Sequence, residues 1–141
     1  MNIVFAIGVL IFRNNKKEIL LVKHGEKAGH PTGIYGIPAG RIDQGETEKE
    51  AAVRELQEET GLETSEADLK PLPYDFGVTS VARKVGVLNC TWKVFVCQKF
   101  QGNISKGGEE TIPEWVKIAD LSKYWLVVNT ETAVSQGLLY T

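Results

Sequence analysis

The segment from Thr47 to Gly61 constrains the fold most, because it joins a helix start signal, a helical pattern and a stop signal. Thr47 followed three residues later by Glu50 predicts a capping box, in which each side chain accepts a free backbone N–H. Alanine, leucine, glutamate and arginine then dominate up to Glu59, and Gly61 is placed to end the helix in a left-handed conformation. We therefore predict a helix over 47–61.

Apolar stretches on both sides of this helix predict β-strands rich in valine, isoleucine and aromatic residues. The predicted strands are 3–12 and 18–22, paired as a hairpin, then a short extended piece at 35–38, and finally 72–81, 85–100 and 113–118. A terminal helix is expected over 129–138, with Asn129 or Thr130 as its cap. Strands around a central helix, followed by a second helix, predict an α/β chain with a mixed sheet covered on both faces.

Length, charge and cysteine content narrow the class of protein. The 141 residues suit one domain, and a net charge of −2 gives no long-range attraction for nucleic acid or an anionic membrane. The apolar run at 3–12 is too short for a membrane span and lacks the flanks of a signal peptide. Cys90 and Cys97 fit no metal-binding spacing and are expected in the core. We expect a cytoplasmic protein, either a monomer or a homodimer.

The acidic residues of the predicted helix gather on one side of it. On a helical wheel Glu55, Glu58 and Glu59 share one arc, and Leu56 lies on the neighbouring apolar arc. The apolar arc is expected to pack on the sheet while the acidic arc lines a cleft. Ala51 falls within the acidic arc, where its small side chain leaves room for an ion. Glutamate-rich faces are often merely solvated, but oxygen-only ligands would suit Mg²⁺.

Arg54 lies within one helical turn of Glu50 and Glu58. Its guanidinium is expected to hold a carboxylate in place through a forked hydrogen bond that lysine cannot form. The alternative is an ordinary surface ion pair, which contributes little to stability.

The stretch 40–62 resembles the signature of the Nudix hydrolase family, G-x5-E-x7-R-E-U-x-E-E-x-G-U, where U is a bulky aliphatic residue. Every specified position is present, as Gly40, Glu46, Arg54, Glu55, Leu56, Glu58, Glu59, Gly61 and Leu62. The order of predicted strands around the motif is also similar to the family's. The resemblance therefore implies a single Nudix-type α/β/α sandwich over residues 1–141, with a central mixed β-sheet.

The resemblance also implies a metal site. Its ligands to Mg²⁺, for which Mn²⁺ can substitute, would be the Gly40 carbonyl and Glu55, Glu58 and Glu59. Glu46 and Arg54 would orient this cluster. The metal would bridge a diphosphate while a water attacks phosphorus, and the cation would offset phosphoryl charge and lower the pKa of that water.

The motif does not determine which glutamate is the general base. We favour Glu58 or Glu59, and Glu109 or Glu110 are rivals because their spacing before Trp115 resembles the MutT branch of the family. Of these two, Glu109 is the better match for an additional metal ligand. The alternative for the pair is a solvated loop after two glycines.

The substrate is less constrained than the chemistry. Pro38-Ala39-Gly40 departs from the common Pro-Gly-Gly entry and resembles the ADP-ribose and nucleotide-sugar branches, but the marker expected in 77–80 is missing. A small-molecule nucleotide, a nucleoside triphosphate cleaved as by MutT, is the first expectation, and ADP-ribose or a nucleotide sugar is the second. A non-catalytic nucleotide sensor is disfavoured because all motif carboxylates are present.

Several further residues have two possible roles. Aromatic residues either stack on a base or pack in the core, and core packing is expected for Tyr35, Tyr74, Trp92 and Trp115. His24 and His30 flank a loop rich in glycine and are left outside the predicted site.

Overall fold

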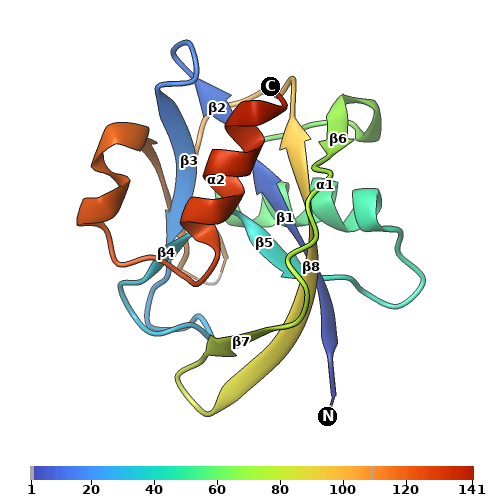
Figure 1. Cartoon of the computed structure of the whole chain (residues 1–141), viewed down its shortest axis with the longest axis vertical. Helices are drawn as coiled ribbons and strands as arrows, with labels where there is room; N and C mark the ends of the chain where they lie inside the picture. The colour runs from blue at the N-terminus through green and yellow to red at the C-terminus, as the bar shows by residue number, and fades with distance from the viewer. Residues whose placement is uncertain (1, 109) are drawn as a thin grey trace.

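The computed structural model describes residues 2–108 and 110–141, and it places two β-sheets between two helices (Figure 1). The first sheet contains β5 (Ala39–Arg41), β1 (Val4–Leu10), β8 (Val87–Cys97), β6 (Leu69–Pro71) and β7 (Thr79–Ala82). The second contains β2 (Phe12–Arg13), β3 (Glu18–Lys23), β4 (Tyr35–Gly36) and β9 (Ile112–Lys117). The helices are α1 (Glu48–Thr60) and α2 (Thr130–Leu139), with short 3₁₀ turns at Glu66–Asp68 and Ile118–Lys123.

The first sheet is mixed because β1 and β8 run parallel while its other pairs are antiparallel. The parallel register extends from Val4 opposite Cys90 to Leu10 opposite Val96. Strand β5 pairs with the other edge of β1, and both β6 and β7 pair with β8. This arrangement brings β5, which carries Gly40, to the edge of the sheet beside α1.

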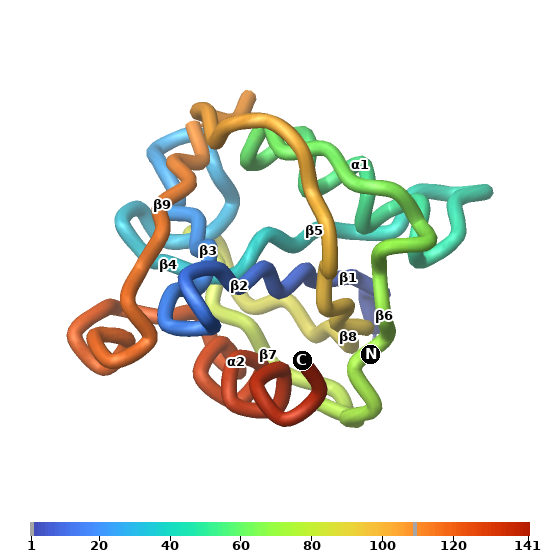
Figure 2. The backbone as a smooth tube through the Cα atoms, turned by 90° about the horizontal axis from the view of Figure 1, so that it is seen from above, coloured from blue at the N-terminus to red at the C-terminus, as the bar shows by residue number. Residues whose placement is uncertain are grey.

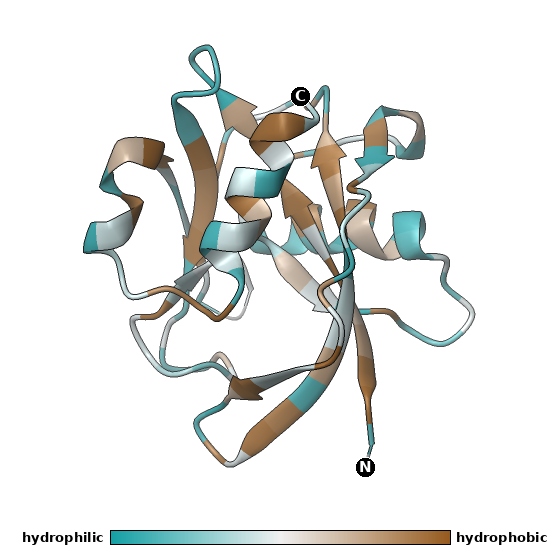
Figure 3. Ribbon diagram, in the orientation of Figure 1, coloured by the Kyte–Doolittle hydropathy of each residue, from teal (hydrophilic) through white to brown (hydrophobic). Residues whose placement is uncertain are grey.

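Alternating side chains on the strands fill two cores, one beneath each helix. The core on the α1 side includes Ile7, Val9, Leu20, Leu56 and Phe95, and the core on the α2 side includes Leu10, Leu21, Val94, Val116 and Val134. Figure 2 shows α1 and α2 on opposite sides of the strands, and Figure 3 shows apolar residues concentrated in β1, β3 and β8. The predicted α/β/α sandwich with a mixed sheet is confirmed.

Helix α1 forms where the sequence predicts it. The Glu50 N–H donates to the Thr47 hydroxyl at 3.1 Å, and the Thr47 N–H donates to the Glu50 carboxylate at 2.9 Å. Gly61 ends the helix with φ of 81°, in the left-handed region, and its N–H donates to the Gln57 carbonyl at 2.9 Å. The capping box and the glycine stop are both confirmed.

The predicted hairpin of 3–12 with 18–22 is mostly wrong. Of the predicted first strand over 3–12, only Phe12, at the start of the two-residue strand β2, pairs with β3. Strand β1 is occupied on both edges by β5 and β8, so it offers no free edge to β3. One backbone hydrogen bond, from the Leu20 N–H to the Ile11 carbonyl at 3.0 Å, connects the segment after β1 to β3.

The predicted strand over 72–81 is also largely wrong, because only 79–82 is a strand in that region. Pro73 has no N–H to give to a ladder. The Asp75 carboxylate accepts the Gly77 N–H at 2.8 Å, and Gly77 has φ of 64°, so this stretch turns instead of extending. The strand predicted at 85–100 is present but shorter, over Val87–Cys97.

Helix α2 begins after Asn129, which is its N-cap as predicted, but the Asn129 side chain does not cap the helix. Asn129 has φ of 73° and makes no side-chain cap hydrogen bond. Its amide instead donates to the Thr79 hydroxyl at 2.9 Å, which connects the start of α2 to β7. Among the helices of the described residues, none combines the length and the apolarity needed to cross a membrane.

Replacing Thr47 tests the capping box. Thr47→Ala removes the acceptor for the Glu50 N–H, and we expect it to lower the free energy of unfolding by about 1 kcal/mol. Thr47→Ser keeps the hydroxyl and is the matched control, expected to stay close to the wild type. Urea unfolding followed by circular dichroism measures both. Equal stability of the alanine and serine variants would show that the capping box does not stabilise α1.

Candidate functional site

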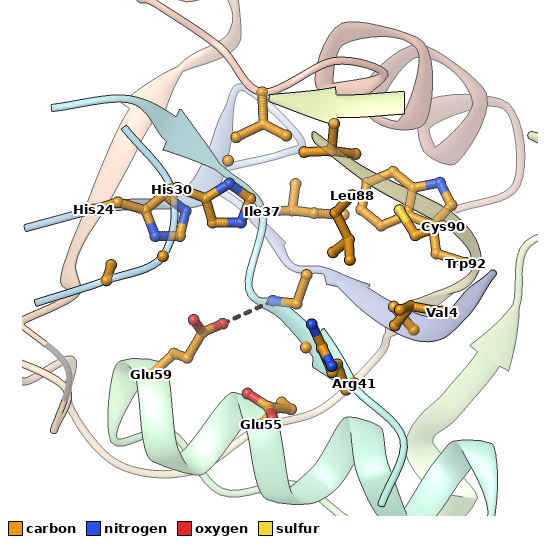
Figure 4. Close-up of a pocket in the computed structure, with 18 of the residues that line it drawn as sticks. Val4, His24, His30, Ile37, Arg41, Glu55, Glu59, Leu88, Cys90 and Trp92 are labelled. Atoms are coloured by element: carbon orange, nitrogen blue, oxygen red, sulfur yellow. Dashed lines mark hydrogen bonds between the residues drawn. The ribbon is translucent and has the colours of Figure 1, made fainter. Parts of the chain in front are cut away.

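The polar face of α1 lies directly against strand β5. The Ala39 N–H donates to the Glu59 carboxylate at 2.7 Å (Figure 4). A Cβ atom added to Gly40 would lie 2.2 Å from the carboxyl carbon of Glu55, so only glycine allows that carboxyl group to approach the strand so closely. Gly40 and two of the motif glutamates, Glu55 and Glu59, therefore lie close together.

Arg54 ties these carboxylates to the loop before the helix. Its Nε and Nη2 atoms donate to the two oxygens of Glu46 at 2.7 and 2.9 Å, the forked geometry that guanidinium favours. Its Nη1 donates to Glu55 at 2.8 Å and to Glu58 at 3.2 Å. Its Nη2 also donates to the Arg41 carbonyl on β5 at 3.0 Å. The forked partner is thus Glu46, whereas Glu50, expected near Arg54, serves in the capping box.

The hydrogen bonds of Arg54 also determine the charges of Arg54 and Glu46. Hydrogen bonds from Arg54, followed by one from the Asp43 N–H, lower the pKa of Glu46 to about 2. Bonding to Glu46 and then to Glu55 raises the pKa of the Arg54 guanidinium above its ordinary value. Both groups are therefore charged at neutral pH, and the positive charge of Arg54 offsets repulsion among its carboxylate partners.

The role predicted for Ala51 is wrong. Ala51 has no exposed surface and packs in the core on the α1 side, together with Ala52 and Leu56. Small side chains at 51 and 52 instead let the helix lie close to the sheet. The acidic residues differ in exposure, with side chains 14% exposed for Glu55 and 53% exposed for Glu58.

A pocket of about 530 Å³ opens beside this cluster. The acidic wall, as we name it, consists of Gly40, Glu55, Glu58 and Glu59. The apolar wall contains Ile37, Leu88 and Trp92, and Figure 4 shows it on the side of the pocket away from the helix. One region of the pocket therefore offers oxygen atoms that can bind a metal ion, and another region suits an apolar group.

A third part of the pocket is not predicted by the sequence. His24 and His30 line it side by side, and His24 is only 6% exposed. Their spacing matches no motif, so the only signal in the sequence was their place at the two ends of the glycine-containing stretch 25–29. We call this pair the histidine wall.

The aromatic candidates lie in different parts of the structure, and only one of the four lines the pocket. Trp92 lines the pocket, whereas Trp115 packs on Phe100 and carries the Arg13 guanidinium 4.3 Å above its ring. Tyr35 and Tyr74 are not among the residues that line the pocket. Core packing or surface placement thus accounts for most of the predicted aromatic candidates.

The acidic loop before β9 is only partly described. Glu109 lies outside the described residues. Glu110 has φ of 61° and its carboxylate lies 3.9 Å from the Lys27 ammonium, and it does not line the pocket. Its neighbour Thr111 does line the pocket, and the Thr111 hydroxyl donates to the Glu59 carbonyl at 3.2 Å.

The donor atoms of the acidic wall fit a hard divalent cation in kind. They are carboxylate oxygens beside a glycine whose missing side chain leaves the Glu55 carboxyl group against the backbone. Within residues 2–108 and 110–141, no three histidine, cysteine, aspartate or glutamate side chains converge as a metal cluster. In this arrangement Glu55 and Glu58 are instead oriented by Arg54.

Comparison with known proteins gives a consistent result. The model of the NUDIX domain family matches residues 3–135. The chain is 39% identical over 71 residues to the 8-oxo-dGTP diphosphatase of Escherichia coli, covering 50% of this chain and 54% of that protein. It is 41% identical over 58 residues to Nudix hydrolase 10 of Arabidopsis thaliana, covering 41% of this chain and 19% of that protein. The chain thus spans about half or less of these relatives.

The fold also matches solved structures. The crystal structure of a MutT NUDIX hydrolase from Burkholderia pseudomallei superposes with a TM-score of 0.76. The alignment covers 96% of this chain and 98% of that chain at 23% sequence identity. At this identity the likeness concerns the fold.

From the low pKa values of the histidine wall we predict how the free energy of unfolding depends on pH. Burial, followed by nearby positive charge, lowers the pKa of His24 from 6.5 to about 3 and that of His30 from 6.5 to about 4. Below pH 6.5 the unfolded chain binds protons that the folded chain does not, so the free energy of unfolding should fall as the pH falls from 7 to 5. Urea unfolding at pH 7, 6 and 5 measures this dependence.

The variant His24→Gln/His30→Gln is the control for that experiment, and its stability should change less over the same pH range. The low pKa of Glu46 acts only below its ordinary value of 4.5, outside this window. Stability of the wild type that is constant or rises between pH 7 and pH 5 would contradict the prediction.

Proposed function

The chain belongs to the Nudix hydrolase family, and from that premise we propose that it hydrolyses the diphosphate linkage of a nucleoside triphosphate with the help of Mg²⁺. One observation carries the proposal. Gly40 and three of the four motif glutamates, Glu55, Glu58 and Glu59, line a pocket that also has an apolar wall. A substrate with a phosphate chain at one end and an apolar ring at the other fits this division.

The acidic wall would hold the cation. Glu55, Glu58, Glu59 and the Gly40 carbonyl are its proposed ligands. A bound cation supplies charge compensation for the phosphoryl oxygens and lowers the pKa of the water that it holds. Arg54 and Glu46 orient the glutamates without touching the substrate, because Arg54 is committed to Glu46, Glu55 and Glu58.

Glu58 is the proposed general base. Its side chain is 53% exposed and lines the pocket, so water reaches it directly. Its contact with Arg54 is a single bond of 3.2 Å, longer than the others that this guanidinium makes to carboxylates in hydrogen bonds. Glu59 is less suited, because its carboxylate already accepts the Ala39 N–H at 2.7 Å.

A substrate panel tests the proposal. Phosphate and pyrophosphate release would be measured from nucleoside triphosphates, ADP-ribose and nucleotide sugars, each with Mg²⁺ and with EDTA. Release from triphosphates that requires Mg²⁺ supports the proposal. Release from ADP-ribose or a nucleotide sugar alone would move the substrate to the second expectation. Binding without metal-dependent release from any compound would favour a nucleotide sensor.

Glu58→Gln tests the proposed base. Glutamine keeps the size of the side chain but cannot take a proton, so we expect kcat to fall by about 10²–10⁴-fold. Glu63→Gln, an exposed position outside the pocket, is the control and should retain full turnover. Near-normal kcat in Glu58→Gln would remove Glu58 from the proposed role and leave Glu59 as the candidate.

A further inference from the structure

His24 and His30 form a compact pair on the pocket. Their ring centroids are 4.3 Å apart and the rings are tilted by 38°. Both line the pocket, on a different side from the acidic wall (Figure 4). Neither residue belongs to the family motif over 40–62. The role of this pair is therefore not explained by the proposed metal site.

Each ring has unused hydrogen-bonding capacity. The Nδ1 atoms of both histidines are buried, and neither finds a hydrogen-bond partner in the described part of the chain. Buried polar atoms without partners are uncommon in folded proteins because they are destabilising. A ligand that pairs with them on entering the pocket would relieve that destabilisation.

Contact with Arg83 fixes which nitrogen of His30 carries the proton. The Nη1 atom of Arg83 lies 3.3 Å from Nε2 of His30. A guanidinium group only donates hydrogen bonds, so Nε2 is the acceptor and the neutral ring holds its proton on Nδ1. The unpaired Nδ1 of His30 is therefore a donor.

The pair is uncharged at neutral pH. Burial is the main cause that lowers the pKa of each ring, and Arg83 adds to it in both cases. Uncharged imidazoles do not attract phosphate by charge. They suit a neutral acceptor such as a carbonyl oxygen.

The other walls indicate which part of a nucleotide carries that acceptor. The acidic wall is assigned to the metal and the phosphate chain, and the apolar wall suits the flat faces of an aromatic ring. The base is the part of a nucleotide that is flat, largely apolar on its faces and equipped with neutral polar atoms at its edge.

We propose that the Nδ1–H of His30, with His24 packed against its ring, donates to the keto oxygen of the substrate's base and makes the pocket select keto-bearing bases. This inference rests on the proposed function, because it takes the ligand to be a nucleotide. Because Nδ1 of His30 is buried in this structure, presenting it to a ligand requires a rotation of the ring about χ2, a soft torsion in histidine, with Arg83 following Nε2.

Binding without metal tests the inference separately from catalysis. Inosine monophosphate and adenosine monophosphate differ at the position that carries a keto oxygen in one and an amino group in the other. Isothermal titration calorimetry at pH 7.5 with EDTA should show the wild type binding the inosine nucleotide about three- to tenfold more tightly. Equal affinity, tighter binding of the adenosine nucleotide, or no binding of either would overturn the inference.

Two substitutions of His30 provide the matched comparison. His30→Asn places an amide nitrogen near the position of Nδ1 and should keep the preference for the keto base. His30→Gln places its polar atoms near the position of Nε2, keeps a partner for Arg83 and should lose the preference. The inference is overturned if the glutamine variant keeps the preference or if both variants lose it equally.

Turnover of triphosphates with Mg²⁺, measured in parallel, distinguishes this inference from the proposed function. Metal-dependent cleavage without base selection would contradict only the role of the histidine wall. Base selection without metal-dependent cleavage of any nucleotide would contradict only the proposed hydrolysis. Urea unfolding of both His30 variants shows whether each is folded under the assay conditions.

Discussion

The hydrogen bonds of the Arg54 guanidinium hold the site together. One side chain contacts carboxylates from the loop before α1 and from two turns of the helix, and it also donates to the Arg41 carbonyl on β5. Without a cation at this point, Glu46, Glu55 and Glu58 would repel one another in a partly buried region. The planar, five-donor geometry of arginine is what allows one residue to serve all these acceptors.

Close docking of α1 on the sheet is the second constraint, and small residues make it possible. Ala51 and Ala52 are fully buried on the face toward the core, and Gly40 leaves space for the Glu55 carboxyl group. The helix can then present Glu55 and Glu59 to the pocket while Leu56 is buried. The same turn of helix thus serves packing and the proposed chemistry.

Local signals explain which features could be predicted from the sequence. The helix at 48–60 was predictable because the residues that start and end it, Thr47, Glu50 and Gly61, lie within the helix or next to it in the sequence. The pairing of β1 with β8 was not, since it joins Val4 to Cys90 across most of the chain. The histidine wall was missed for the same reason. His30 meets Arg83 only because the hairpin after β7 packs on the stretch 25–30, where the Lys84 N–H donates to the Gly29 carbonyl at 3.0 Å.

The same difference between local signals and distant contacts explains which parts of the candidate site could be predicted. The motif predicted Gly40, Glu55, Glu58 and Glu59 as metal ligands, and all four line the pocket. Helical geometry predicted the contact between Arg54 and Glu58, but it could not reveal the forked pair with Glu46, which lies on the loop before the helix. Position on a wheel could not reveal that Ala51 faces the core, since that depends on how the helix docks on the sheet.

If Arg54 orders the glutamates for a cation, Arg54→Lys should bind Mg²⁺ more weakly than the wild type. Lysine keeps the positive charge but cannot form the forked pair with Glu46 or reach the other acceptors at once. Titration calorimetry should show affinity lowered by about 10- to 100-fold, the usual effect of losing a residue that orients metal ligands. Unchanged Mg²⁺ affinity in a folded Arg54→Lys protein would show that Arg54 does not order the metal ligands.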